Sequence, residues 1–88
     1  MKHYNEDDLE FLVSAIEETD DVYVKLPVGK IRAEHDLAKD LGLDSLGKVN
    51  LFYEISDRLE TDDEEEEETL GWKQVRDILS YIHENRND

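Results

Sequence analysis

Apolar residues recur at helical spacing in three stretches of this chain, and the first lies near its start. There they follow the i, i+3, i+4, i+7 pattern of an amphipathic helix, at Leu9, Leu12, Val13 and Ile16. The pattern predicts a helix over residues 7–18 with Asn5 as its N-cap. Asp7 and Asp8 then fall in the first turn, where negative charge suits the helix dipole.

The second stretch predicts a helix from Ser45 to about Leu59, with Asp44 as its N-cap. Its apolar residues cover more than one stripe: Leu46, Val49, Leu51, Phe52, Tyr53, Ile55 and Leu59. A helix that only packs on a core needs a narrower stripe, so we expect the surplus to have another use. Glu54 and Arg58 are spaced for an i, i+4 ion pair.

The third stretch predicts a final helix over residues 72–84, with apolar residues at Trp72, Val75, Ile78, Leu79 and Ile82. Before it, residues 60–68 hold eight acids interrupted only by Thr61, and the next apolar residue is Leu70. A short helix in this acidic segment would have little apolar surface to pack. The three periodic stretches and this segment predict an all-α bundle of three main helices plus one short helix.

Residues 20–44 form a long first connection. Apolar residues alternate along part of it, at Val22, Val24, Leu26 and Val28. Alternation is typical of a strand, but no second segment offers a partner strand, so we expect an extended loop packed over the helices. With 88 residues the chain is expected to be one small domain, residues 1–88, with a thin core.

Charge and composition narrow the function. A net charge of −15 excludes nucleic acid as a natural partner and favours proteins with basic docking patches. The chain has no cysteine, so thioester chemistry would require a thiol from elsewhere. It has no apolar run that resembles a signal peptide or a membrane span, which predicts a cytoplasmic protein without membrane contact, expected to be a monomer.

The candidate chemistry lies at Ser45, within Asp40-Leu41-Gly42-Leu43-Asp44-Ser45-Leu46. A phosphate ester on this hydroxyl would lie at a helix N-terminus, where unpaired N–H groups and the dipole favour an anion. Serine is also common at helix starts without any modification. The other serines, Ser14, Ser56 and Ser80, fall inside expected helices and lack the preceding turn.

The segment from about residue 36 to 83 resembles the acyl carrier proteins. It has Leu37 ahead of the Asp-Leu-Gly turn, Asp-Ser-Leu at the helix start, an acidic stretch and a last helix ending Ser80-Tyr81-Ile82. The resemblance implies an acyl-carrier-like bundle that is not an enzyme. It implies a 4'-phosphopantetheine cofactor on Ser45, flanked by Asp44 and Leu46, which carries acyl groups as thioesters.

The resemblance also implies partners and a pocket. The partners would be a phosphopantetheinyl transferase and the synthases, ligases or transferases of fatty-acid, polyketide or related metabolism, which would dock on Val49 and Tyr53. Residues expected to face the bundle interior would shelter the acyl chain: Leu51, Ile55, Leu59, Trp72, Val75 and Leu79. Ordinary core packing is the alternative for all of these positions.

Departures from the family pattern point to a specialised carrier. Gly47 and Asn50 stand where the family usually has acids, and Trp72 replaces a smaller apolar residue, which would shorten the pocket. A carrier for an amino or hydroxy acid stays open. So does an acidic helical module that binds a basic protein without a prosthetic group.

A divalent-ion buffer is a further alternative. The acid run at 62–68 lacks the glycine-centred spacing of an EF-hand loop, so we expect a solvated acidic face and no metal site. His3, His35 and His83 lie near no motif and are expected to have surface roles.

Overall fold

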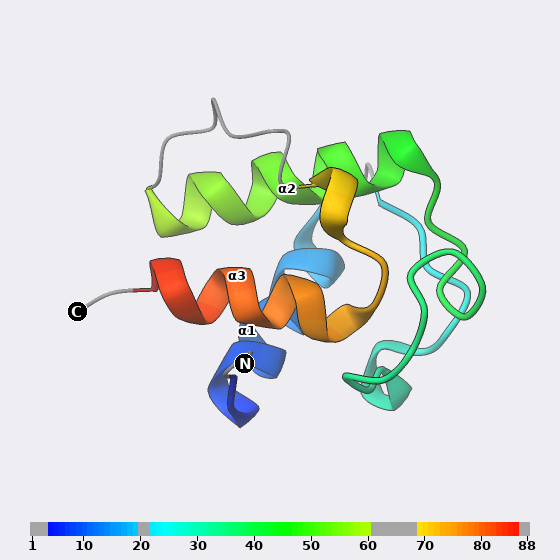
Figure 1. Ribbon diagram of the computed structural model, residues 1–88, viewed down its shortest axis with the longest axis horizontal. Helices are drawn as coiled ribbons and strands as arrows, with labels where there is room; N and C mark the ends of the chain where they lie inside the picture. The colour runs from blue at the N-terminus through cyan, green and yellow to red at the C-terminus, as the bar shows by residue number, and fades with distance from the viewer. Residues whose placement is uncertain (1–3, 20–21, 61–68, 87–88) are drawn as a thin grey trace.

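The computed structural model describes residues 4–19, 22–60 and 69–86. Over these ranges it contains three α-helices, α1 (Glu6–Glu18), α2 (Ser45–Leu59) and α3 (Val75–Asn85), and a short 3-10 helix, η1 (Val28–Lys30). Figure 1 shows α2 and α3 running in the same direction, and α1 packs against both. The expected all-α bundle with a long first loop is confirmed.

The N-terminus of α1 is closed by a capping box. Asn5 is the N-cap: its Oδ1 accepts the N–H of Asp8 at 3.2 Å, and Asp8 Oδ2 accepts the N–H of Asn5 at 2.9 Å. The expected N-cap is therefore confirmed, and the helix begins one residue earlier than predicted. Two donors that a helix start leaves unpaired are satisfied by this exchange.

Asp8 is also buried, which the sequence did not indicate. Its side chain is 0% exposed, and its carboxylate lies 3.0 Å from Nδ1 of His83 and 3.3 Å from Nη2 of Arg86. Its Oδ1 has no hydrogen bond among the described residues. Asp8 thereby links the start of α1 to the end of α3 by charge as well as by packing.

Replacing Asp8 with alanine is expected to lower the free energy of unfolding by about 2 kcal/mol, because the cap and the charged contacts to α3 are lost together. Urea denaturation measures the change. Asp7→Ala is the matched control, since Asp7 is exposed in the same helical turn and its loss is expected to cost less than about 0.5 kcal/mol. Equal losses in the two variants would contradict a structural role for the Asp8 carboxylate.

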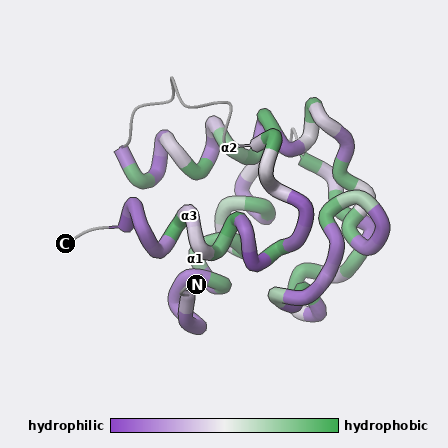
Figure 2. The backbone as a smooth tube through the Cα atoms, in the orientation of Figure 1, coloured by the Kyte–Doolittle hydropathy of each residue, from purple (hydrophilic) through white to green (hydrophobic). Residues whose placement is uncertain are grey.

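The long connection covers the bundle as an extended loop. Val22 is buried, while Val24, Leu26 and Val28 are partly buried and pack against the core. Figure 2 shows hydrophobic and hydrophilic residues interspersed along this segment and along the helices. The described residues contain no β-strand, only an isolated bridge between Asp36 and Gln74. The expectation of a packed loop instead of a strand is confirmed.

The helix α2 begins and ends where the sequence predicts. Asp44 is its N-cap, and the helix ends at Leu59, followed by the C-cap residue Glu60, whose backbone is left-handed with φ 59°. The expected Glu54–Arg58 pair forms at 2.8 Å, and Arg58 also contacts Glu18 of α1 at 2.6 Å. The hydrogen bond from Arg58 holds the pKa of Glu18 below its usual value, so this carboxylate stays ionised at lower pH than an isolated glutamate.

The helix α3 begins at Val75, so the prediction that it starts at residue 72 was wrong. Lys73 O accepts the N–H of Leu37, and the N–H groups of Val75 and Arg76 donate to carbonyls in the first connection. These bonds hold the backbone before Val75 against the loop in a non-helical path. Asp77 then completes a capping box with Gln74.

The short helix expected in the acidic segment falls mostly on residues 61–68, which lie outside the described residues. Residues 69–71 form a single 3-10 turn, followed by the buried Trp72. Trp72, Phe52 and Tyr81 form an aromatic cluster with ring centroids 5.6–6.0 Å apart. Across the described ranges, no helix has the length and apolar character needed to cross a membrane.

Candidate functional site

Ser45 is the first residue of α2 and is exposed. The preceding residue, Asp44, caps the helix: its carboxylate accepts the N–H of Gly47 at 2.7 Å, and its carbonyl accepts the N–H of Lys48 at 3.0 Å. The hydroxyl therefore lies at the positive end of a helix that is 15 residues long. A phosphate ester at this position would face solvent on one side and the helix dipole on the other.

The turn before Ser45 is held in place by three leucines. Leu37, Leu41 and Leu43 are all buried in the core, and the N–H of Leu43 donates to the carbonyl of Leu37 at 2.8 Å. Between them Gly42 has φ +79°, a left-handed conformation that favours glycine. The Asp-Leu-Gly turn noted in the sequence thus positions the start of α2 through buried side chains.

The long first loop also reaches this turn. The N–H of Lys25 donates to the carbonyl of Leu41 at 2.8 Å, and the aliphatic part of its side chain lies over Gly42. A Cβ on Gly42 would come within 2.9 Å of Lys25 Cγ. Sequence reasoning missed this contact, because its only trace is one lysine within the alternating segment.

Replacing Gly42 with alanine is expected to lower the free energy of unfolding by about 1–2 kcal/mol, since alanine disfavours the left-handed conformation and displaces Lys25. Thermal melting measures the loss, and the amide shift of Ser45 reports the displaced turn. Gly29→Ala is the control, because a Cβ at Gly29 meets nothing within 4 Å. A Gly42 variant as stable as the Gly29 variant would contradict the strained turn.

A surface hollow of about 310 Å³ lies beside Ser45. The two neighbours of Ser45 both line it, together with residues of the first loop, the turn and α2: Tyr23, Gly42, Leu43, Asp44, Leu46, Gly47 and Asn50. Its lining combines apolar groups with an amide, a phenol and the Asp44 carboxylate, which already accepts the N–H of Gly47, and the amide and apolar groups suit an arm made of amide and methyl groups. The exposed hydroxyl, the helix N-terminus and this hollow together fit a phosphopantetheine group.

The expected docking residues lie along one face of α2. Leu46 is 66% exposed and Tyr53 is 40% exposed, with Val49 half-buried between them. Spacings of three and four residues place all three side chains on the same face, leading away from Ser45. The surplus of apolar residues on this helix is thus partly explained by an exposed strip, and its use in docking stays a prediction.

The expected acyl-pocket residues come together in the core. Leu51, Ile55, Trp72, Val75 and Leu79 are buried, and Leu59 packs partly buried against them. Trp72 contributes from the turn before α3 and not from the helix itself. Sequence reasoning missed the neighbouring Tyr81, whose hydroxyl lies 3.3 Å from Ser56 Oγ. The packing accounts for these residues as core, and an acyl cavity among them stays a prediction.

The other serines and His83 lie in or beside the helices. Ser14, Ser56 and Ser80 lie within α1, α2 and α3, as expected. His83 is partly exposed, yet it pairs with the buried Asp8, so its surface role includes a contact that its sequence position did not suggest.

The other expectations concern His35, His3 and the acid run. His35 Nδ1 accepts the N–H of Arg32 at 3.0 Å. His3 and the acid run 62–68 lie outside the described residues. Residues 4–19, 22–60 and 69–86 contain no cluster of three or more metal-ligating side chains.

A comparison with curated proteins finds a relative that is an acyl carrier protein. The chain is 43% identical over 58 residues to the acyl carrier protein of Phytoplasma mali (strain AT). This likeness supports the resemblance to the acyl carrier protein family that the sequence motifs indicate. It extends over 62% of this chain and 64% of the relative, so the chain spans less than two thirds of the relative's length. The three-helix bundle is consistent with the acyl carrier fold. No protein-family model and no solved structure matches the chain.

Proposed function

We propose that this protein carries acyl groups as thioesters on a 4'-phosphopantetheine arm attached to Ser45. The observation that carries the proposal is the exposed Ser45 hydroxyl at the start of α2, behind a turn held by buried leucines. The likeness to an acyl carrier protein supports a carrier role and not a catalytic one. The absence of cysteine agrees with a role in which the thiol comes from the prosthetic group.

Ser45 acts as a nucleophile once, during attachment of the arm. Its Oγ attacks the phosphorus of coenzyme A that bears the pantetheine, the bond from that phosphorus to the adenosine bisphosphate breaks, and the Ser45 proton passes to a base on the transferase. When bound, the arm supplies the thiol that holds the acyl group. The transferase also supplies the metal, so this chain needs no catalytic residue beyond the hydroxyl.

The residues around Ser45 would hold the phosphate of the arm at the start of α2. The positive end of the α2 dipole would favour the phosphate charge, while the N–H of Gly47 donates to the Asp44 carboxylate and keeps it turned toward the helix. Asp44 and Leu46 line the hollow on either side of the attachment point.

Partner enzymes are proposed to dock on the exposed strip of α2 formed by Leu46, Val49 and Tyr53, which we call the α2 strip. Leu46, Val49 and Tyr53 offer apolar contact beside the arm, and the net charge of −15 attracts basic patches. Such attraction speeds encounter more than it adds affinity, which suits a carrier that must leave each enzyme. We propose synthases, ligases or transferases of fatty-acid, polyketide or related acyl metabolism as partners, in the cytoplasm.

The acyl chain is proposed to shelter among the buried residues between α2 and α3. Leu51, Ile55 and Leu79 would face it, with Val75 and Leu59 at its sides. Trp72 fills part of this region through its contacts with Phe52 and Tyr81. We therefore propose a shallow pocket that takes short acyl groups.

The proposal is tested by incubating the protein with coenzyme A and a broad-specificity phosphopantetheinyl transferase, then measuring intact mass and mapping the modified peptide. We expect one phosphopantetheine group per chain, on Ser45. Ser56 is an internal control, since it is buried and bonded to Tyr81 and should stay unmodified. A chain that several transferases all leave unmodified would favour an acidic binding module.

A further inference from the structure

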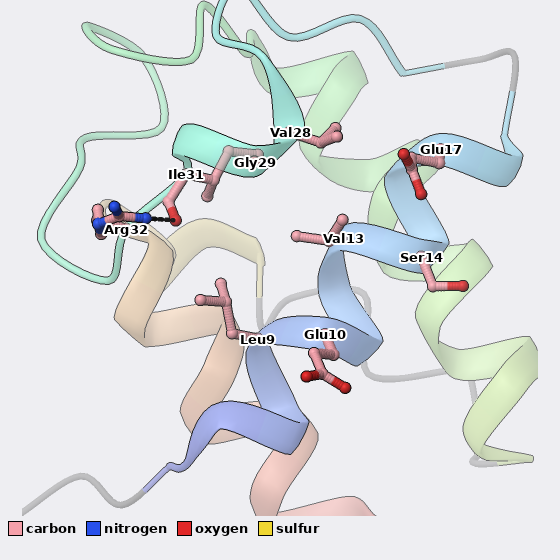
Figure 3. A pocket seen from close by; sticks show the side chains of 9 residues that line it. All are labelled: Leu9, Glu10, Val13, Ser14, Glu17, Val28, Gly29, Ile31 and Arg32. Carbon is pink, nitrogen blue, oxygen red and sulfur yellow. Dashed lines mark hydrogen bonds between the residues drawn. The ribbon is translucent and has the colours of Figure 1, made fainter.

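A second surface hollow, of about 290 Å³, lies between the outer face of α1 and the segment that includes η1. Figure 3 shows Leu9 and Val13 pointing from α1 toward Val28 and Ile31 across it. These four side chains form an apolar floor, which we call the α1 groove. It shares no lining residue with the hollow beside Ser45.

The α1 groove exists because α1 has more apolar surface than the core can cover. The single stripe expected from the sequence divides in the structure: Leu12 and Ile16 are buried in the core, whereas Leu9 and Val13 remain half-buried at the surface. Gly29 lies at the mouth, and a Cβ added there would meet nothing within 4 Å. The groove is therefore open to an entering side chain.

The acidic residues on the α1 side of the groove favour a basic partner. Glu10 and Glu17 line its α1 side, both exposed, and neither forms an ion pair with another described residue. They are seven positions apart, about 10 Å along the helix. On the loop side Arg32 donates Nη1 to the carbonyl of Ile31 at 3.5 Å, and Lys30 is exposed nearby. A net charge of −15 opposes both a second copy of this chain and an anionic ligand.

We propose that the α1 groove docks a basic amphipathic helix of a partner protein. An apolar side chain of that helix enters between Leu9, Val13 and Val28, while two lysines or arginines seven positions apart face Glu10 and Glu17. This is the helix-in-groove mode of recognition, with the charges setting its register. The partner is held on α1 while Ser45 and the α2 strip remain accessible, so docking here does not compete with the proposed carrier function.

The test uses the full chain and a synthetic leucine–lysine amphipathic helix whose lysines are spaced seven apart beside a leucine ridge. Amide chemical shifts of the labelled protein report where the peptide binds. We expect the largest changes at Val13, Val28 and Gly29 and small changes at Ser45 and Tyr53. A peptide of the same composition, scrambled to remove the apolar ridge, is expected to bind at least about tenfold more weakly.

Gly29→Phe adds a large side chain at a residue that lines the α1 groove and is expected to weaken binding at least about tenfold. Gly71→Phe is the matched control, because Gly71 also has nothing within 4 Å of an added Cβ but does not line the groove. Glu10→Gln with Glu17→Gln keeps the shape and removes the charges, and should lower the affinity and its salt dependence. This double variant keeps the test valid if Gly29→Phe unfolds the protein.

Shift changes confined to α2, or full binding by both Gly29→Phe and the glutamine double variant, would overturn the proposal. Decanoate producing the same shifts more strongly than the peptide would also overturn it, in favour of a lipid. Ser45→Ala should bind the peptide as the parent does. A failure of the carrier function is therefore distinguishable from a failure of this docking site.

Discussion

Replacing Ser45 with alanine is expected to abolish phosphopantetheine attachment completely while leaving the fold intact. The change removes the hydroxyl at the start of α2, but Ser45 is exposed and Asp44 still caps the helix through Gly47. Intact mass after treatment with coenzyme A and a transferase measures attachment, and thermal melting measures the fold. We expect no mass increase and a free energy of unfolding within about 0.5 kcal/mol of the parent.

Ser56→Ala is the matched control for this change. It removes a hydroxyl from the same helix, but one that is buried and 3.3 Å from the Tyr81 hydroxyl, so attachment should be complete and only stability should fall. Attachment that persists in Ser45→Ala would contradict the site. If Ser45→Ala loses no function in cells, an acidic binding module is favoured. If only neutralising residues 62–68 removes function, an ion buffer is favoured.

Replacing Phe52 with alanine is expected to lower the free energy of unfolding by about 3–5 kcal/mol. Its side chain is 0% exposed, and its ring lies 6.0 Å from that of Trp72 and 5.7 Å from that of Tyr81. Removing it leaves a cavity where α2, α3 and the turn before α3 meet. Small domains are stable by only about 5–15 kcal/mol, so urea denaturation should show much of the stability lost.

Two controls separate this cavity from loss of an aromatic ring in general. Phe52→Leu keeps most of the volume and should cost much less than Phe52→Ala. Tyr53→Ala removes the neighbouring ring, which is 40% exposed and in edge contact with Phe52 at 5.7 Å, and should cost about 1 kcal/mol. If Phe52→Ala costs no more than Tyr53→Ala, the aromatic cluster is not a centre of the core.

The carrier proposal and the α1 groove together describe a protein with two separate surfaces. The α2 strip lies beside Ser45 and would contact enzymes that act on the arm, whereas the α1 groove would hold a partner without covering the arm. Each surface has a variant that leaves the other unchanged. The two functions are therefore independently measurable.

Local sequence was sufficient for the helices whose ends depend on neighbouring residues. The start of α2 follows from Asp44, whose carboxylate caps the helix, and the start of α1 follows from Asn5 in the same way. The start of α3 was predicted three residues too early, although Trp72 is apolar and at helical spacing. Backbone bonds to Leu37 and His35 hold that segment against a loop distant in sequence, and helical periodicity carries no information about such bonds.

The sequence by itself determined the helical bundle, the long first loop and the position of Ser45, because helical periodicity, capping residues and the Asp-Ser-Leu motif are all local. Only the tertiary structure decided which apolar residues face the core, since both Leu9 and Leu12 fit the same stripe but pack differently. It also decided that Asp8 is buried against His83 and that Lys25 lies over Gly42. Each of these outcomes depends on contacts between residues far apart in the chain, which form only when the whole bundle has folded.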